Sequence, residues 1–130
     1  MDHRIVDLHV HSTESDGTLT PEDLVAEAKK VGLAAFALTD HDTCQGVCKA
    51  MPCAASAGIE LIPGIELSTD YHGKEVHIVG LYIDMENEQL LKKTAEYRKC
   101  RSERNALMVE ALQKEGLSIT MEELVAENPD

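Results

Sequence analysis

One short segment of alternating polarity restricts the folds open to this chain more than any other feature. Residues 5–11 read Ile-Val-Asp-Leu-His-Val-His, so in a strand Val6, Leu8 and Val10 would share one face and Asp7, His9 and His11 the other. Two imidazoles two residues apart on one strand face can bind one metal ion or flank two. We therefore expect a half-buried strand whose polar face carries potential ligands.

The elements expected after this strand follow an order typical of α/β proteins. Thr20 and Pro21 predict a helix start, with Thr20 as the N-cap, and Gly32 predicts its end. The order favours an α/β fold with a mainly parallel sheet. The later expected elements are a buried strand at 35–38, a helix at 45–57 that Pro52 kinks or divides, a strand at 64–68 and a strand at 75–83.

The chain changes character after residue 86. Residues 87–115 predict one long polar helix or two, and Thr120-Met121-Glu122-Glu123 forms a capping box that opens another helix. We expect residues 1–86 to form the first strands and helices of the main fold, with the metal motifs. Residues 87–130 would form a helical insertion that the chain leaves unfinished.

The net charge of −12, from 24 acidic and 12 basic residues, argues against a general nucleic-acid or membrane coat. Bound divalent cations would locally reverse the negative electrostatic potential of such a surface. No apolar run approaches the roughly 18 residues that span a bilayer, and no charged and apolar leader opens the chain. The four cysteines form no CxxC pair. We therefore expect reduced thiols, no membrane association and a cytoplasmic location.

Half of the basic residues lie within thirteen positions of the expected long helix. Arg98 and Arg101 are three residues apart on one helix face, which suits binding to phosphate oxygens. The alternative is a solvated face paired with neighbouring acidic residues. The six residues are Lys92, Lys93, Arg98, Lys99, Arg101 and Arg104.

Potential metal ligands recur at the ends of the expected strands, where sites gather in parallel α/β proteins. Imidazole and carboxylate ligands together suit zinc, manganese or iron rather than calcium, and magnesium remains an option. A carboxylate such as Glu66 can bridge two ions, and two close ions can activate water for attack on phosphorus. The candidate ligands are His9, His11, Asp16, His41, Glu66 and His77.

Four segments resemble motifs of the polymerase and histidinol phosphatase (PHP) family. Residues 7–17 (DLHVHSTESDG) resemble its first motif and residues 39–42 (TDHD) its second. Residues 63–66 (PGIE) and 75–80 (EVHIVG) resemble two further ligand-bearing stretches. The resemblance implies the N-terminal portion of a distorted (β/α)7 barrel that holds up to three metal ions.

The resemblance also implies how the ligands are shared. His9 and His11 would hold one ion, and Glu66 would bridge it to a second ion bound by His77.

A third ion would be held by Asp16 and His41. Asp40 is not implied as a ligand; we expect it to lie behind the metal ligands and to orient His41.

The helical stretch after the fourth strand resembles an insertion of the small stand-alone members of the family. Those members are linked to nucleoside bisphosphate hydrolysis and to 5′-to-3′ trimming of short RNAs. The resemblance thus implies a metal-dependent hydrolase of phosphate monoesters or diesters of nucleotides or short RNA, with Arg98 and Arg101 as candidates for binding substrate. It does not imply binding to duplex DNA.

Three alternatives stay open. One is a histidinol-phosphatase-like enzyme, and another is an amidohydrolase-type metal enzyme, which also has an HxH pair after its first strand. The third is an inactive metal-binding fragment that needs a partner. Members of the resembled family carry further ligands, a His and a later Asp-x-His pair, in a carboxyl-terminal half that this sequence does not contain. We therefore expect these 130 residues to hold their metals incompletely when alone.

Overall fold

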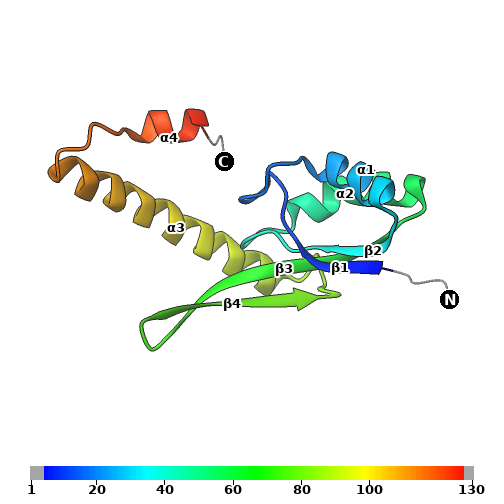
Figure 1. Ribbon diagram of the computed structural model, residues 1–130. Helices are drawn as coiled ribbons and strands as arrows, with labels where there is room; N and C mark the ends of the chain where they lie inside the picture. The colour runs from blue at the N-terminus through cyan, green and yellow to red at the C-terminus, as the bar shows by residue number, and fades with distance from the viewer. Residues whose placement is uncertain (1–4, 128–130) are drawn as a thin grey trace.

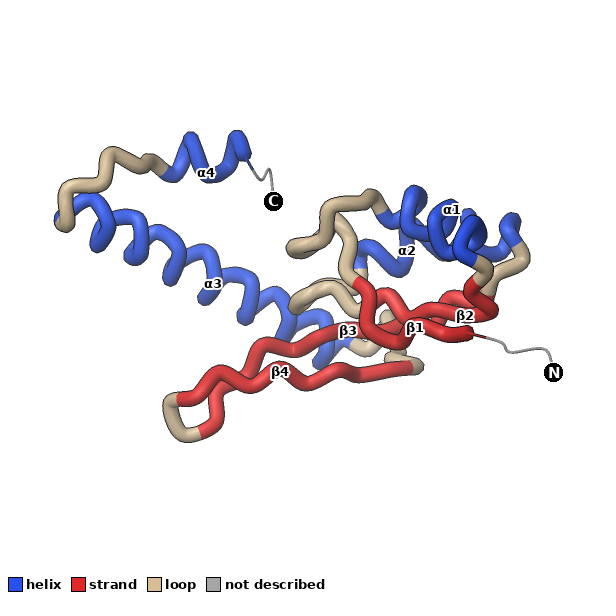
Figure 2. The backbone as a smooth tube through the Cα atoms, in the orientation of Figure 1, coloured by secondary structure: helices blue, strands red, loops and turns tan. Residues whose placement is uncertain are grey.

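A curled four-stranded sheet with helices on one face forms the body of the protein, and a long helix extends away from it (Figures 1 and 2). The computed structural model describes residues 5–127. The elements are β1 (Ile5–Val10), α1 (Pro21–Val31), β2 (Leu33–Leu38), α2 (Gln45–Ala57), β3 (Glu60–Tyr71), β4 (Lys74–Leu81), α3 (Glu88–Lys114) and α4 (Met121–Glu127).

The strands lie in the order β1-β2-β3-β4, which is also their order along the chain. β1 pairs with β2, and β2 with β3, in parallel, whereas β3 and β4 form an antiparallel hairpin. The predicted α/β class with a mainly parallel sheet is confirmed. Both parallel crossovers are helices, α1 and α2, and parallel pairing brings the carboxyl ends of β1, β2 and the first half of β3 to the same edge.

The helix boundaries follow the predicted capping chemistry. The Thr20 hydroxyl accepts a hydrogen bond from the Asp23 amide, Pro21 takes the first helical position, and Gly32 ends α1 in the left-handed region at φ 79°. Gly58 ends α2 in the same way, at φ 70°. Pro52 does not divide α2, which continues as one helix from Gln45 to Ala57.

The core lies between the two crossover helices and one face of the sheet. Side chains alternate along β2, so Phe36 and Leu38 face the helices while Ala35 and Ala37 lie on the other face, against Ile62. The main cluster is formed by Val25, Ala28, Phe36, Leu38, Val47, Ala50 and Ala54.

The burial predicted for β1 is wrong. Of the three side chains on the predicted apolar face, Val6 and Leu8 are 50% and 42% exposed, and only Val10 packs partly against the core. The alternation in the sequence correctly predicted a strand with two faces. It could not predict that β1 is an edge strand, with β2 as its one partner in the part of the chain that the structure describes.

The polar stretch after β4 forms one long helix rather than two. Asn87 caps α3 by accepting a hydrogen bond from the Leu90 amide. The helix leaves the sheet, and α4 turns back over its far end (Figure 1). Within residues 5–127, no helix combines the length and the apolar character needed to cross a membrane.

Candidate metal centre

The centre of the site is Glu66, which lies where β3 changes partners. Up to Pro63, β3 pairs with β2, and from Gly64 onward it pairs with β4. Just beyond the end of β2, the Glu66 amide donates to the Asp40 carbonyl and the Glu66 carbonyl accepts from the Asp42 amide. These bonds hold Glu66 beside the loop that follows β2, and the residue is 5% exposed.

Three imidazoles from two strands surround the Glu66 carboxylate. His9 Nε2 and His11 Nε2, both from β1 or its end, lie 2.9 and 2.8 Å from Oε2. His77 Nδ1, from β4, lies 3.0 Å from Oε1. Both carboxylate oxygens therefore face potential metal ligands, which is the arrangement that a bridging carboxylate requires.

Asp16 and His41 complete the cluster on its other side. His11 Nδ1 lies 2.7 Å from Asp16 Oδ1, so His11 presents one ring nitrogen to each carboxylate. His41 Nε2 lies 3.6 Å from Asp16 Oδ2 and also 3.6 Å from Glu66 Oε2. His41 is thus shared between the two carboxylates, and Asp16 gains His11 as a neighbour that the family resemblance did not assign to it.

The six candidate ligands come together in one continuous cluster. Ligand atoms around a tetrahedral ion with bonds of about 2.1 Å are about 3.4 Å apart, so separations of 2.7–3.6 Å suit metal coordination. Three sets of three residues could each hold an ion, because within each set the ligand atoms all lie within 4.8 Å of one another. The sets are His9, His11 and Glu66; His11, Asp16 and His41; and His41, Glu66 and His77.

The protonation behaviour of these groups fits cation binding. Burial lowers the pKa of His41 below its ordinary value, against the opposing effect of Glu66 and Asp16, so its imidazole stays neutral and able to bind a metal. Among the described residues, its buried Nδ1 has no hydrogen-bond partner. Burial raises the pKa of Glu66, but the hydrogen bond from His9 and the nearby imidazoles outweigh it and leave the pKa lowered.

The expected contact between Asp40 and His41 is absent from the described structure. The Asp40 carboxylate instead accepts hydrogen bonds from Ser12 and Ser15, in the loop between β1 and α1. Asp40 does not contact His41 because its carboxylate is turned toward the β1–α1 loop, and the residue is 1% exposed.

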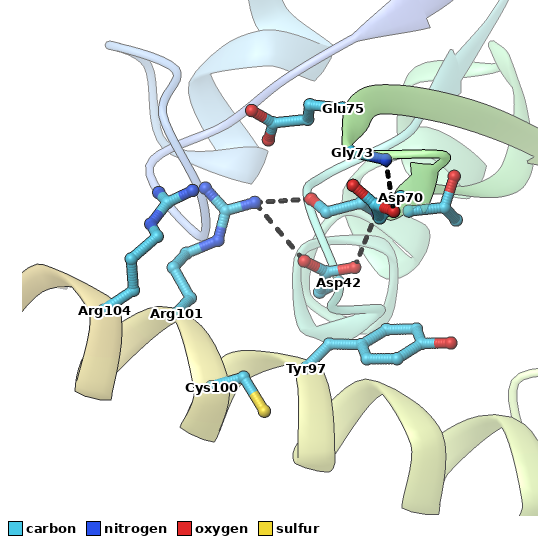
Figure 3. Close-up of a pocket in the computed structure, with 10 residues that line it drawn as sticks. Asp42, Asp70, Gly73, Glu75, Tyr97, Cys100, Arg101 and Arg104 are labelled. Atoms are coloured by element: carbon cyan, nitrogen blue, oxygen red, sulfur yellow. Dashed lines mark hydrogen bonds and ion pairs between the residues drawn. The ribbon is translucent and has the colours of Figure 1, made fainter.

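The two arginines predicted to bind substrate contact Asp42 in the loop after β2. Arg98 donates to the Asp42 carbonyl. Arg101 donates to the Asp42 carboxylate and to the Ser68 hydroxyl (Figure 3). Sequence analysis missed this role of Asp42, although an Asp after a strand and arginines three residues apart were both visible as signals.

A pocket of about 400 Å³ lies between α3 and the β3–β4 hairpin (Figure 3). Arg101, Arg104 and Tyr97 line it from the helix, and Asp70 and Glu75 from the hairpin. Glu75 Oε1 lies 3.1 Å from His77 Nε2, so the pocket opens directly beside the metal cluster. Arg98 is not among its lining residues.

The family model of the PHP domain matches residues 7–124. The chain belongs to the PHP family. It is 41% identical over 112 residues to the 5′-3′ exoribonuclease Rnm of Escherichia coli, an alignment that covers 85% of this chain and 38% of that protein. It is 39% identical over 113 residues to a 3′,5′-nucleoside bisphosphate phosphatase of Chromobacterium violaceum, covering 87% of this chain and 40% of that protein.

A solved PHP-type structure confirms the fold. A protein of Bifidobacterium adolescentis described as a metal-dependent phosphoesterase superposes with a TM-score of 0.88 at 34% identity, over 95% of this chain and 43% of that one. The expected partial PHP barrel is therefore confirmed. The chain spans about 40% of the length of the curated relatives it matches.

Replacing Glu66 by Gln should weaken the binding of more than one metal ion, because a neutral amide cannot serve as a bridging anion. Metal content after equilibration with Mn²⁺ or Zn²⁺ and dialysis, measured by elemental analysis, tests this. The control is His72→Asn, an exposed turn residue at φ 53°, which should leave metal content unchanged. Wild-type metal content in Glu66→Gln would remove the bridging role.

In the metal-free chain, His77 should protonate at a higher pH than an ordinary histidine and His41 at a lower pH. The hydrogen bond that His77 donates to the Glu75 carboxylate raises the pKa of His77, so acidification charges His77 before His41, and a charged imidazole cannot bind metal. NMR titration of the ring signals measures both values. Glu75→Gln should lower the pKa of His77; an unchanged value would show that Glu75 does not control it.

Proposed function

We propose that this chain is the metal-binding part of a phosphoesterase that hydrolyses phosphate monoesters or diesters of nucleotides or short RNA. The observation that carries the proposal is the shared use of Glu66, whose two oxygens face histidines from both sides of the site. The PHP family membership and the names of the relatives support the same activity.

The chemistry of the donors suits up to three divalent ions, of manganese, zinc or iron, with magnesium as an option. When bound, such ions lower the pKa of a water molecule and offset negative charge at phosphorus. The chain itself supplies imidazoles on β1, at the ends of β1 and β2, and on β4. Glu66 would be shared by two of the ions, and Asp16 would add a second carboxylate at the edge of the cluster.

The pocket beside the cluster supports a substrate with more than one anionic group. Arg101 and Arg104 line this pocket together with Glu75, the ion-pair partner of His77, and guanidinium forks match phosphate oxygens. A nucleotide with one phosphate at the metals would direct a second phosphate or the rest of an RNA chain toward this pocket. Arg98 would act on substrate indirectly, because it holds the Asp42 carbonyl.

A partner-dependent form of the same function is supported by the open edge of the sheet. β1 pairs on one side only within the described residues, and its apolar side chains are exposed. A polypeptide equivalent to the remainder of a full-length relative would cover this strand and could add metal ligands.

A substrate screen tests the proposal directly. The chain, loaded with Mn²⁺ or Zn²⁺, is assayed on nucleoside 3′,5′-bisphosphates, short 5′-phosphorylated RNA, an aryl phosphate monoester and diester, and an amide. We expect phosphoester hydrolysis that a chelator abolishes, slow for the chain alone and faster after addition of the carboxyl-terminal part of a relative. Hydrolysis of the amide alone would favour the amidohydrolase alternative. Phosphoester hydrolysis that survives both chelation and Glu66→Gln would contradict the proposal.

Removing a guanidinium group from the pocket should weaken nucleotide binding. Arg101→Ala and Arg104→Ala should each cost about 1–3 kcal/mol, the scale of a hydrogen bond to a charged group, and should reduce the salt dependence of binding. Calorimetric titration with a nucleoside bisphosphate at low and high salt measures both effects. The control is Lys99→Ala, an exposed α3 residue outside the pocket. Equal affinity in all three variants would show that Arg101 and Arg104 do not bind the substrate.

A further inference from the structure

The Asp40 carboxylate is buried but has no cationic partner among the described residues. It is 1% exposed, and its three hydrogen-bond donors all come from the loop between β1 and α1. Oδ1 accepts from the Ser12 amide at 2.6 Å and from the Ser15 hydroxyl at 2.8 Å, and Oδ2 accepts from the Ser12 hydroxyl at 2.7 Å. Burying a carboxylate is costly unless its oxygens are satisfied, so these bonds strongly favour one position of the loop.

Two glycines let the loop close tightly around this carboxylate. A Cβ on Gly46, in the first turn of α2, would lie 2.3 Å from Asp40 Oδ2 and 3.0 Å from Ser12 Oγ. A Cβ on Gly17 would lie 2.3 Å from the His11 carbonyl oxygen, and the Gly17 amide donates to the Ser12 carbonyl. The loop is therefore packed against both α2 and the end of β1.

The Ser15 hydroxyl connects Asp40 to the metal cluster. It donates to Asp40 Oδ1 at 2.8 Å and lies 3.3 Å from Asp16 Oδ1 and 3.5 Å from His11 Nδ1. Asp16 is the next residue in the chain, so the position of Ser15 sets where the Asp16 carboxylate can reach. The Asp16 side chain is 63% exposed, and its other neighbours among the described residues are the candidate ligands His11, at 2.7 Å, and His41, at 3.6 Å.

We infer that Asp40 is a positioning residue that fixes the β1–α1 loop, through Ser12 and Ser15, so that Asp16 can bind metal together with His11 and His41. The inference rests on the proposed metal function. It replaces the expected action of Asp40 on His41 with an action on Asp16, whose carboxylate lies 3.6 Å from His41 in the same group of candidate ligands. Asp40 does not touch the ion in this arrangement, and its effect passes through the two serines.

Metal titration of the purified 130-residue chain with Mn²⁺, followed by electron paramagnetic resonance and calorimetry, tests the inference. Asp16→Asn identifies which Mn²⁺ site depends on Asp16. Asp40→Asn and Ser15→Ala should each lower the affinity of that same site about 10- to 100-fold, the usual effect of removing a group that supports a ligand. Combining Asp40→Asn with Asp16→Asn should add little further loss, because both changes act on one ligand.

Two variants separate positioning from a general loss of structure. Ser15→Thr keeps the hydroxyl and should bind the ion nearly as tightly as the wild type. Ala54→Gly weakens the main core cluster near the carboxyl end of α2, without a contact to the loop, and should leave the Asp16-dependent ion in place. If Ala54→Gly weakens this ion as much as Asp40→Asn, or if Ser15→Ala has no effect, the inference is wrong.

A measurement without metal distinguishes this inference from the proposed function. Amide hydrogen exchange at Ser12, Ser15 and Gly17 in the metal-free chain should be faster in Asp40→Asn than in the wild type, while the amides of β2 keep their protection. If the wild type binds no divalent ion, the proposed function fails. If exchange in the loop is unchanged by Asp40→Asn, Asp40 does not position the loop, whatever the metal result.

Discussion

The structure around the site depends on one constraint, the placement of the Glu66 carboxylate at the point where β3 exchanges a parallel partner for an antiparallel one. The first half of β3 follows β2, and the second half follows β4. Glu66 lies just past that change and is bonded through its backbone to the residues on either side of His41. Histidines from β1, the β2 end and β4 can therefore meet one carboxylate only because β3 belongs to both halves of the sheet.

Three buried carboxylates share this corner of the molecule, and their partners separate their roles. Asp40 is satisfied by two hydroxyls and an amide, and Asp42 by the Ser68 amide and Arg101. Glu66 faces imidazoles instead, and imidazole is the commonest metal-binding side chain. A cation among them would complete the compensation of the buried charge. The acidic balance of the whole chain is consistent with that requirement.

Local pattern was sufficient to predict the elements and the candidate ligands, because strand alternation and capping act over a few residues. The HxH pair, the Thr20 cap and Gly32 are examples. Long-range packing was not predictable in the same way. The exposure of Ile5 and Val6 depends on which strand lies at the edge of the sheet, and the donors to Asp40 stand 25 and 28 residues earlier in the chain. The ligand roles themselves stay predictions.

The attachment of α3 ties the pocket to the metal cluster. Arg98 and Arg101 reach the residue that directly follows His41, 56 and 59 positions away in sequence, and Arg101 also reaches Ser68, two residues after Glu66. A displacement of the inner end of α3 would therefore act on the segments that carry two candidate ligands. Conversely, a shift of His41 or Glu66 on metal binding would move the anchors of Arg101. Because the same guanidinium lines the pocket, the position of the pocket and the spacing of the ligands cannot change independently.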